Sequence, residues 1–353
     1  MTALALPAAR RPLVTLALPA VLAVLAAAML SGLAIGAVPI APARVVAILA
    51  EALGFGDSGA SARERLVLIE VRLPRVLVGA LVGAGLAVAG AALQGLFRNP
   101  LADSDLIGVS SGAAVTTALA ILAGPLPFLV WLGPQAVPLA AFAGGLAVLG
   151  LVWRVAGGGP DRVATMLLAG VGIGALARAA LGFASFVSTD QQLRDITFWL
   201  LGSLGGAGWG RLWAMAPLLL PAVWLLLRQA RALDALALGY REAGHLGVDV
   251  NRLARIVTWT AALIVGAAVA VSGVIGFVGL ITPHLVRLMV GPAHGRLMLL
   301  SAVLGAALLV AADTAARTIV TPAELPVGIL TAVMGVPVFI ALLIRRRRAQ
   351  EAS

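Results

Sequence analysis

Long apolar runs separated by short polar segments dominate the chain. A helix needs about 20 apolar residues to cross a bilayer, whereas membrane β-strands show alternating segments of about ten residues. The continuous runs predict an all-α integral membrane protein with about ten transmembrane helices in a single domain, residues 1–353. The predicted helices cover residues 13–38, 72–97, 105–123, 128–154, 163–187, 208–229, 251–272, 275–290, 296–316 and 325–344.

Composition supports a membrane location and narrows the chemistry. Hydrophobic residues make up 61% of the chain and charged residues 11%, with a mean hydropathy of +1.06, whereas about a quarter of a soluble domain is charged. The sequence contains no cysteine and no lysine, which excludes disulfides, thiolate ligands and a phosphate-binding lysine. We expect no catalytic residues, no metal site and no enzymatic activity of its own.

Arginines indicate the orientation in the membrane. With both termini on the cytoplasmic side, 16 of the 25 arginines face the cytoplasm, 8 face outward, and Arg178 lies within a helix. Positive residues accumulate on the cytoplasmic side of membrane proteins. The net charge of +10 is therefore interpreted as a topology signal and not as a nucleic-acid-binding surface.

Residues 230–250 form a polar-leaning segment on the predicted cytoplasmic side. It contains RALDALALGYREAGHLGVD, in which leucines recur near helical spacing. A short pair of amphipathic helices of this kind lies on a membrane surface or docks into a groove of a partner. The residues alone favour neither alternative.

Three blocks of sequence carry a family resemblance. Residues 72–115 contain R-L-P-R and Q-G-L-F-R-N-P-L-A-D, residues 273–287 read GVIGFVGLITPHLVR, and residues 324–339 read ELPVGILTAVMGVPVF. The chain resembles the permease subunits of type II ABC importers for iron chelates, haem and cobalamin. The resemblance implies a homodimer in the bacterial inner membrane, with two cytoplasmic ATPase subunits that bind ATP and a periplasmic binding protein. No permanently bound cofactor is expected.

The resemblance also implies two contact sites for partners. Arg72, Arg75 and Arg317 are expected at the outer surface, where guanidiniums would pair with carboxylates of the binding protein; alternatively they anchor helices at the lipid headgroups. Residues 236–248 resemble the helices that transmit movement from the ATPase. The expected coupling residues are Leu238, Gly239, Arg241, Glu242, His245, Leu246 and Gly247.

The expected pathway is lined by residues 163–187, 193–203 and 325–344, and residues 191–209 are most similar to haem permeases. Phe198 and Trp199 would offer apolar, planar contact to a porphyrin, or anchor the chain at the interface. Arg178 lies in the middle of an apolar helix, where an unpaired charge costs several kcal/mol. Its partner would be a haem propionate or, alternatively, a carboxylate or helix-end carbonyl of the protein.

Other functions remain as alternatives. Within the family, haem is the first candidate cargo, a ferric siderophore the second and cobalamin the third. A stand-alone secondary transporter would need acidic residues within its membrane helices, and the acidic residues here cluster at predicted helix ends and loops. His284 lies in the T-P-H block, away from His245 and His294, which is why no metal site is expected.

Overall fold

The computed structural model describes residues 11–124, 126–157, 162–320 and 322–351. This part of the chain is helical and contains no β-strand. Within these described ranges, seven helices are long and apolar enough to cross a membrane, and three apolar helices are shorter. Together they coincide with the ten predicted spans: α1 Arg11–Ala34, α4 Leu73–Leu96, α5 Val109–Ala123, α7 Ala136–Ala156, α8 Arg162–Val187, α10 Trp209–Leu227, α13 Val250–Ser272, α14 Val278–Val290, α15 His294–Ala316 and α16 Val327–Glu351.

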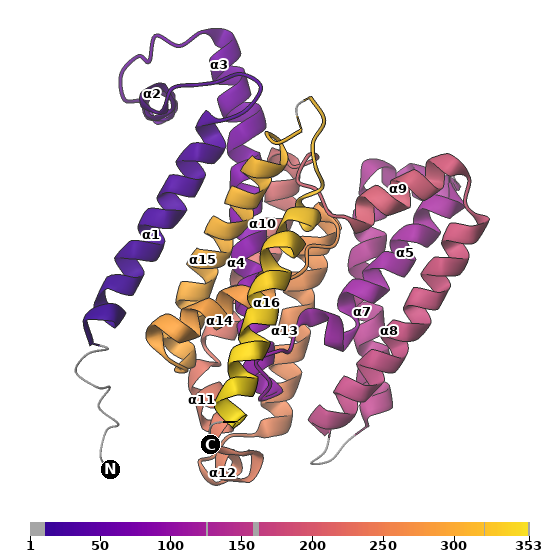
Figure 1. The fold of residues 1–353 in the computed structure, drawn as a ribbon. Helices are drawn as coiled ribbons and strands as arrows, with labels where there is room; N and C mark the ends of the chain where they lie inside the picture. The colour runs from indigo at the N-terminus through magenta and orange to yellow at the C-terminus, as the bar shows by residue number, and fades with distance from the viewer. Residues whose placement is uncertain (1–10, 125, 158–161, 321, 352–353) are drawn as a thin grey trace.

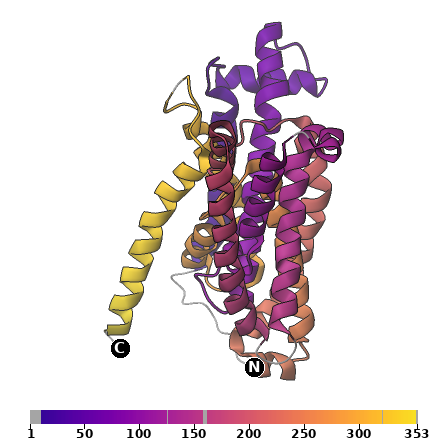
Figure 2. The ribbon, with the colours of Figure 1, turned by 90° about the vertical axis from the view of Figure 1, so that its right-hand side faces the viewer.

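Short helices connect these spans. They are α2 Pro42–Ala52, α3 Ala62–Leu66, α6 Pro127–Leu132, α9 Asp190–Leu200, α11 Ala230–Leu238 and α12 Tyr240–His245. α11 and α12 lie at the end of the bundle where α1 begins and α16 ends, and α2, α3 and α9 lie at the opposite end (Figure 1). The start of α1 and the end of α16 lie at the same end because the chain passes along the bundle an even number of times. Figure 2 shows α16 leaning away from the other helices toward its C-terminal end.

The centre of the bundle is built on α4, which is buried along most of its length and contacts α10, α13, α14 and α15. Glycines permit this packing: a Cβ on Gly83 would overlap the backbone of Gly305 in α15, and a Cβ on Gly90 would overlap Gly279 in α14. Small residues let membrane helices approach until their backbones touch. The core therefore depends on glycine at these crossings.

Several helix boundaries differ from the predicted ones, and two of these differences have a clear local cause. The second predicted helix begins at residue 72, but helical structure starts at Ala62 and continues through a π-helical turn, Val67–Arg72, into α4. Ser61 and Glu64 form a capping box at this start, a signal that the S-x-x-E spacing carries. α14 begins at Val278 and not at residue 275, because residues 273–277 form a loop with Phe277 in a left-handed conformation.

Candidate functional site

Three breaks between helices meet at one place beside α9. The backbone N–H of Ser203 donates to the Ser272 carbonyl at 2.7 Å, and the N–H of Val327 donates to the Gly202 carbonyl at 3.0 Å. Gly202 and Gly273 have φ angles of +68° and +67°, which glycine adopts at low cost. This contact joins the segments that follow α9 and α13 to the start of α16.

The loop that leaves this junction, residues 273–277, precedes a short membrane helix. α14 has 13 residues and is about 20 Å long at 1.5 Å per residue, which is shorter than the hydrocarbon core of about 30 Å. The loop at residues 273–277 therefore replaces part of a membrane span. Irregular backbone at such depth is tolerated where protein buries it or where it lines a cavity.

A cavity of about 210 Å³ opens on one side of the junction, between α5, α8 and α9. Arg178 of α8 and Ser111 of α5 both line it. Both side chains border Gly174, where a Cβ would lie 3.5 Å from Arg178 Nη1 and 3.6 Å from Ser111 Oγ. Among the described residues, Arg178 has no ion pair and no hydrogen bond from its side chain. The cavity is lined by Asp105, Ser110, Ser111, Ala114, Ala177, Arg178, Leu181, Leu200 and Val274.

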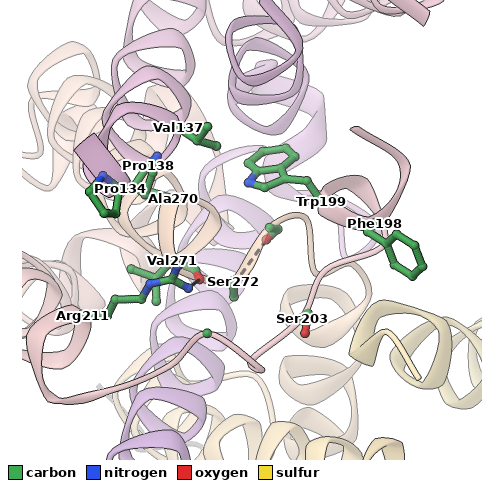
Figure 3. Close-up of a pocket in the computed structure, with 12 residues that line it drawn as sticks. Pro134, Val137, Pro138, Phe198, Trp199, Ser203, Arg211, Ala270, Val271 and Ser272 are labelled. Carbon is green, nitrogen blue, oxygen red and sulfur yellow. Dashed lines mark hydrogen bonds between the residues drawn. The ribbon is translucent and has the colours of Figure 1, made fainter. Parts of the chain in front are cut away.

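A second cavity of about 330 Å³ lies between α7, α9 and α13 (Figure 3). Trp199 points into it toward Val137 and Pro138, whereas Phe198 borders the cavity and directs its ring, which is 61% exposed, to another side. Successive residues of an α-helix are separated by about 100° around its axis, at 3.6 residues per turn. Phe198 and Trp199 therefore do not present one shared aromatic face to the same pathway.

Arg75 is one of the three arginines expected at the outer surface, and it is 8% exposed. Its Nε and Nη2 donate to the Asp313 carboxylate at 2.9 and 2.8 Å, and its Nη1 and Nη2 donate to Glu324 at 3.0 and 2.9 Å. The arginine thus ties α4 to α15 and to the loop before α16. The Arg75 guanidinium also lowers the pKa of Glu324 below its ordinary value.

Arg72 and Arg317 are also directed inward. Arg72 is 3% exposed and donates to the carbonyls of Leu33 and Ala34 at the end of α1. Arg317 donates to the Gly32 carbonyl, and its Nε lies 3.7 Å from an Asp313 carboxylate oxygen. The expectation that these three guanidiniums are exposed is wrong, because helix-end carbonyls and carboxylates of the same chain occupy them. Docking of a binding protein at these positions stays a prediction.

The segment at residues 230–250 folds as the expected pair of short helices, α11 and α12. Leu233, Leu236 and Ala243 are buried, whereas Leu238 and Leu246 are exposed by 66% and 63%. Figure 1 shows the pair beyond the end of the bundle. The segment therefore packs one apolar side against the protein and leaves two leucines uncovered.

The polar residues of the coupling segment lie mostly between the two uncovered leucines in the sequence. Gly239 has a φ of +143° and is covered by the Glu242 carboxylate, which leaves no room for a Cβ. Tyr240 donates to the Leu96 carbonyl at 3.4 Å and lies under the Arg98 guanidinium at 5.6 Å; burial raises its pKa. The remaining expected coupling residues are exposed: Arg241, Glu242, His245 and Gly247.

Sequence reasoning missed two polar contacts that hold these regions. Asp313 and Glu324 are the partners of Arg75, 238 and 249 residues away in sequence. Asp234 of α11 accepts from the backbone N–H of His294 at 2.8 Å and lies 2.7 Å from its Nδ1, which attaches the coupling segment to α15. The sequence carries no signal for these contacts, because the two partners lie on different helices and come together only when those helices pack.

Known proteins resemble this chain along most of its length. The sequence model of the FecCD transport family matches residues 23–345. The hemin transport system permease protein HmuU of Yersinia pestis is 47% identical over 281 residues, covering 80% of this chain and 84% of that protein. The cobalamin import system permease protein BtuC of Halobacterium salinarum is 45% identical over 280 residues, covering 79% and 73%.

A solved structure matches the fold. It is described as an inward-facing conformation of a metal-chelate type ABC transporter, and it superposes with a TM-score of 0.80 at 32% sequence identity. The match covers 93% of this chain and 98% of that chain.

Proposed function

This chain belongs to the FecCD transport family, and from that premise we propose that its cargo is haem. It is a multi-pass permease of an ABC importer in the bacterial inner membrane, as the resemblance implied. Importers of this kind work with ATPase subunits and substrate-binding proteins. The alternative of a secondary transporter that works alone is therefore wrong.

The unpaired Arg178 is the observation that supports haem. It lies in the middle of α8, and the described residues provide no ion pair for it, although a cation within a membrane helix needs a partner or water. Haem carries two propionates, and a guanidinium binds a carboxylate through two parallel N–H groups. In this proposal Arg178 pairs transiently with a propionate as the porphyrin passes.

Phe198 extends the proposed pathway with an apolar contact. Its ring is 61% exposed at the end of α9, where it borders the second cavity without pointing into it as Trp199 does (Figure 3). An exposed aromatic ring stacks favourably on a planar apolar ligand. Trp199 points to a different side, and we assign it no contact with the cargo while the chain holds this conformation.

Two other cargoes have support of their own. A cobalamin permease is 45% identical, which is close to the 47% of the hemin permease. The structural neighbour is described as a metal-chelate type transporter, which keeps a ferric siderophore as a candidate. The side chain of Arg178 favours a cargo with free carboxylates, and haem meets this condition with two.

The proposed assembly is a homodimer surrounded by lipid, with both termini and the α11–α12 segment in the cytoplasm. The uncovered leucines Leu238 and Leu246 would enter a groove on each of two ATPase subunits, which bind ATP. The binding protein would dock at the opposite end. If Arg75 takes part, an incoming carboxylate must replace Glu324.

Transport by the purified complex tests this proposal. The permease, its ATPase and its binding protein would be reconstituted in vesicles, and uptake of haem, cobalamin and a ferric siderophore would be measured with and without ATP. We expect ATP-dependent haem uptake and no ATP hydrolysis by the permease alone. Uptake of cobalamin or the siderophore without haem uptake would contradict the proposed cargo.

A further inference from the structure

A groove runs along α7, α10 and α13 on the side of the bundle away from Arg178. It joins the second cavity to a neighbouring one of about 170 Å³, and the two share Pro138, Arg211, Ala270 and Val271. We propose that this groove binds an anionic phospholipid. The phosphate lies on Arg211, and an acyl chain follows the apolar wall between α7 and α10.

The guanidinium of Arg211 is placed to receive an anion. Its Nη1 donates to the Val271 carbonyl at 3.2 Å, which uses one of five N–H donors. Among the described residues, no other partner occupies this side chain. Figure 3 shows the guanidinium at the cavity, next to Val271 and Ser272. A planar guanidinium with free N–H groups matches phosphate oxygens.

The loop before α10 is shaped around this guanidinium. Gly206 lies so close to Arg211 that a Cβ would overlap the guanidinium. The guanidinium therefore lies against the loop at residues 203–208, and its hydrogen bond to the Val271 carbonyl places it at the end of the groove.

The rest of the groove is apolar and open to lipid. Leu139, Phe142, Met215, Leu218 and Ala267 line it. The other side of α10, about half a turn away from the groove, is also apolar and exposes Trp213, Leu220 and Trp224. An acyl chain would pack against this apolar wall, and Arg211 at the end of the groove would select the headgroup.

Tryptophans indicate that Arg211 lies at headgroup depth. Trp209 and Trp213 flank it along α10 with ring centroids 6.3 Å apart, and Trp131 at the same end of the bundle is 80% exposed. Tryptophan is enriched at the membrane–water interface. A cation at this depth, above an apolar groove between helices, fits a phospholipid headgroup and not a soluble anion.

Native mass spectrometry tests the phospholipid. The detergent-purified chain would be titrated with phosphatidylglycerol and with phosphatidylcholine of the same acyl chains. We expect a preference for phosphatidylglycerol that Arg211→Gln lowers about fivefold, the effect of one arginine at an anionic surface. Arg194→Gln is the matched control, because Arg194 is an exposed arginine of α9 at the same end. Equal loss in both variants, or no loss in Arg211→Gln, would overturn the proposal.

A second arm works if Arg211→Gln does not fold. Ala214→Trp fills the apolar wall of the groove and leaves Arg211 in place; we expect it to lower binding of both lipids while the melting temperature is kept. Competition with free glycerol phosphate separates a lipid from a soluble anion, since displacement of the lipid by the free headgroup overturns the lipid proposal.

The same position tests whether a second copy covers the groove. The chain has no cysteine, which makes Ala214→Cys a unique label. We expect reaction with lipid-phase maleimide and no disulfide between copies. A disulfide-linked dimer through residue 214 would overturn the proposal, because the groove would then be a protein interface.

Discussion

Arg75 and Arg178 are both arginines of apolar membrane helices, and the structure treats them in opposite ways. Arg75 is buried and makes charged hydrogen bonds to both Asp313 and Glu324. Arg178 lines an open cavity and has no ion pair among the described residues. The first residue holds helices together, and the second has binding capacity left for a molecule outside the chain.

The contrast shows how to separate structural from functional charges in a membrane protein. A buried charge is stable when every donor has an acceptor, and removing one partner leaves the other charge unpaired. A charge that faces a cavity without a partner still destabilises the folded protein, because no pairing offsets the free energy of placing it within the membrane. The following predictions test whether the two arginines fall on opposite sides of this division.

The largest effect is expected for Arg75→Ala. It leaves the Asp313 carboxylate, which is 3% exposed, without its main partner, and such a loss costs about 3–5 kcal/mol. Thermal unfolding in detergent should show a strongly lowered melting temperature. The double variant Arg75→Met, Asp313→Leu should recover part of it, because the buried carboxylate is removed together with its partner, although Glu324 then loses Arg75 and Arg317 loses Asp313. An unchanged melting temperature for Arg75→Ala would remove the structural role.

Arg178→Ala is expected to slow transport without loss of stability. A charged hydrogen bond contributes about 1.5–3 kcal/mol, so haem uptake should fall by roughly tenfold or more while ATP hydrolysis continues and the melting temperature is kept. Arg178→Lys should rescue in part if charge attraction suffices, and not at all if the planar fork is needed.

Asp105→Asn is the control for Arg178. Asp105 is the carboxylate that lines the same cavity. If Arg178 and Asp105 form a structural pair in the working complex, both Arg178→Ala and Asp105→Asn should lower the melting temperature. Normal haem uptake by a normally stable Arg178→Ala complex would contradict both the cargo contact and the structural pair.

The α11–α12 segment offers the same comparison with leucines. Leu246→Asp changes an uncovered side chain and should weaken binding of the ATPase subunit by about tenfold, the size of an interface residue worth more than 1 kcal/mol. Leu236→Ala empties a buried position and should instead lower the melting temperature by an effect of about 2–5 kcal/mol. A pull-down of the ATPase and a melting curve on each variant separate the two outcomes.

The smallest effect concerns pH and Glu324. Arg75 lowers the pKa of this carboxyl in the folded protein, so its contribution is present above the unfolded pKa and is lost as the pH falls through the lowered folded pKa. Because the Glu324 side chain is 45% exposed, we expect less than about 1 kcal/mol. Melting curves of the parent and Glu324→Gln should differ at neutral pH and converge on acidification; a constant difference would contradict the pairing.

Much of the fold follows from the sequence, and the exceptions have physical causes. Hydropathy located the seven helices long enough to cross a membrane and the three shorter apolar ones among the described residues, and the spacing of leucines in residues 230–250 predicted the helix pair that the structure contains. The start of α3 at Ala62 was missed although Ser61 and Glu64 carry the capping signal. The different directions of Phe198 and Trp199 also follow from helical geometry, which separates neighbouring residues by about 100°.

The sequence by itself determined that this is an all-α membrane permease of the FecCD family. Lipid accepts apolar side chains and requires each span to pair its own backbone groups, so composition and run length suffice for the architecture. Only the tertiary structure decided which arginines are paired. Arg75 meets Asp313 across 238 residues of sequence, and Arg178 meets a cavity, because pairing depends on which helices pack side by side and not on the local sequence around either residue.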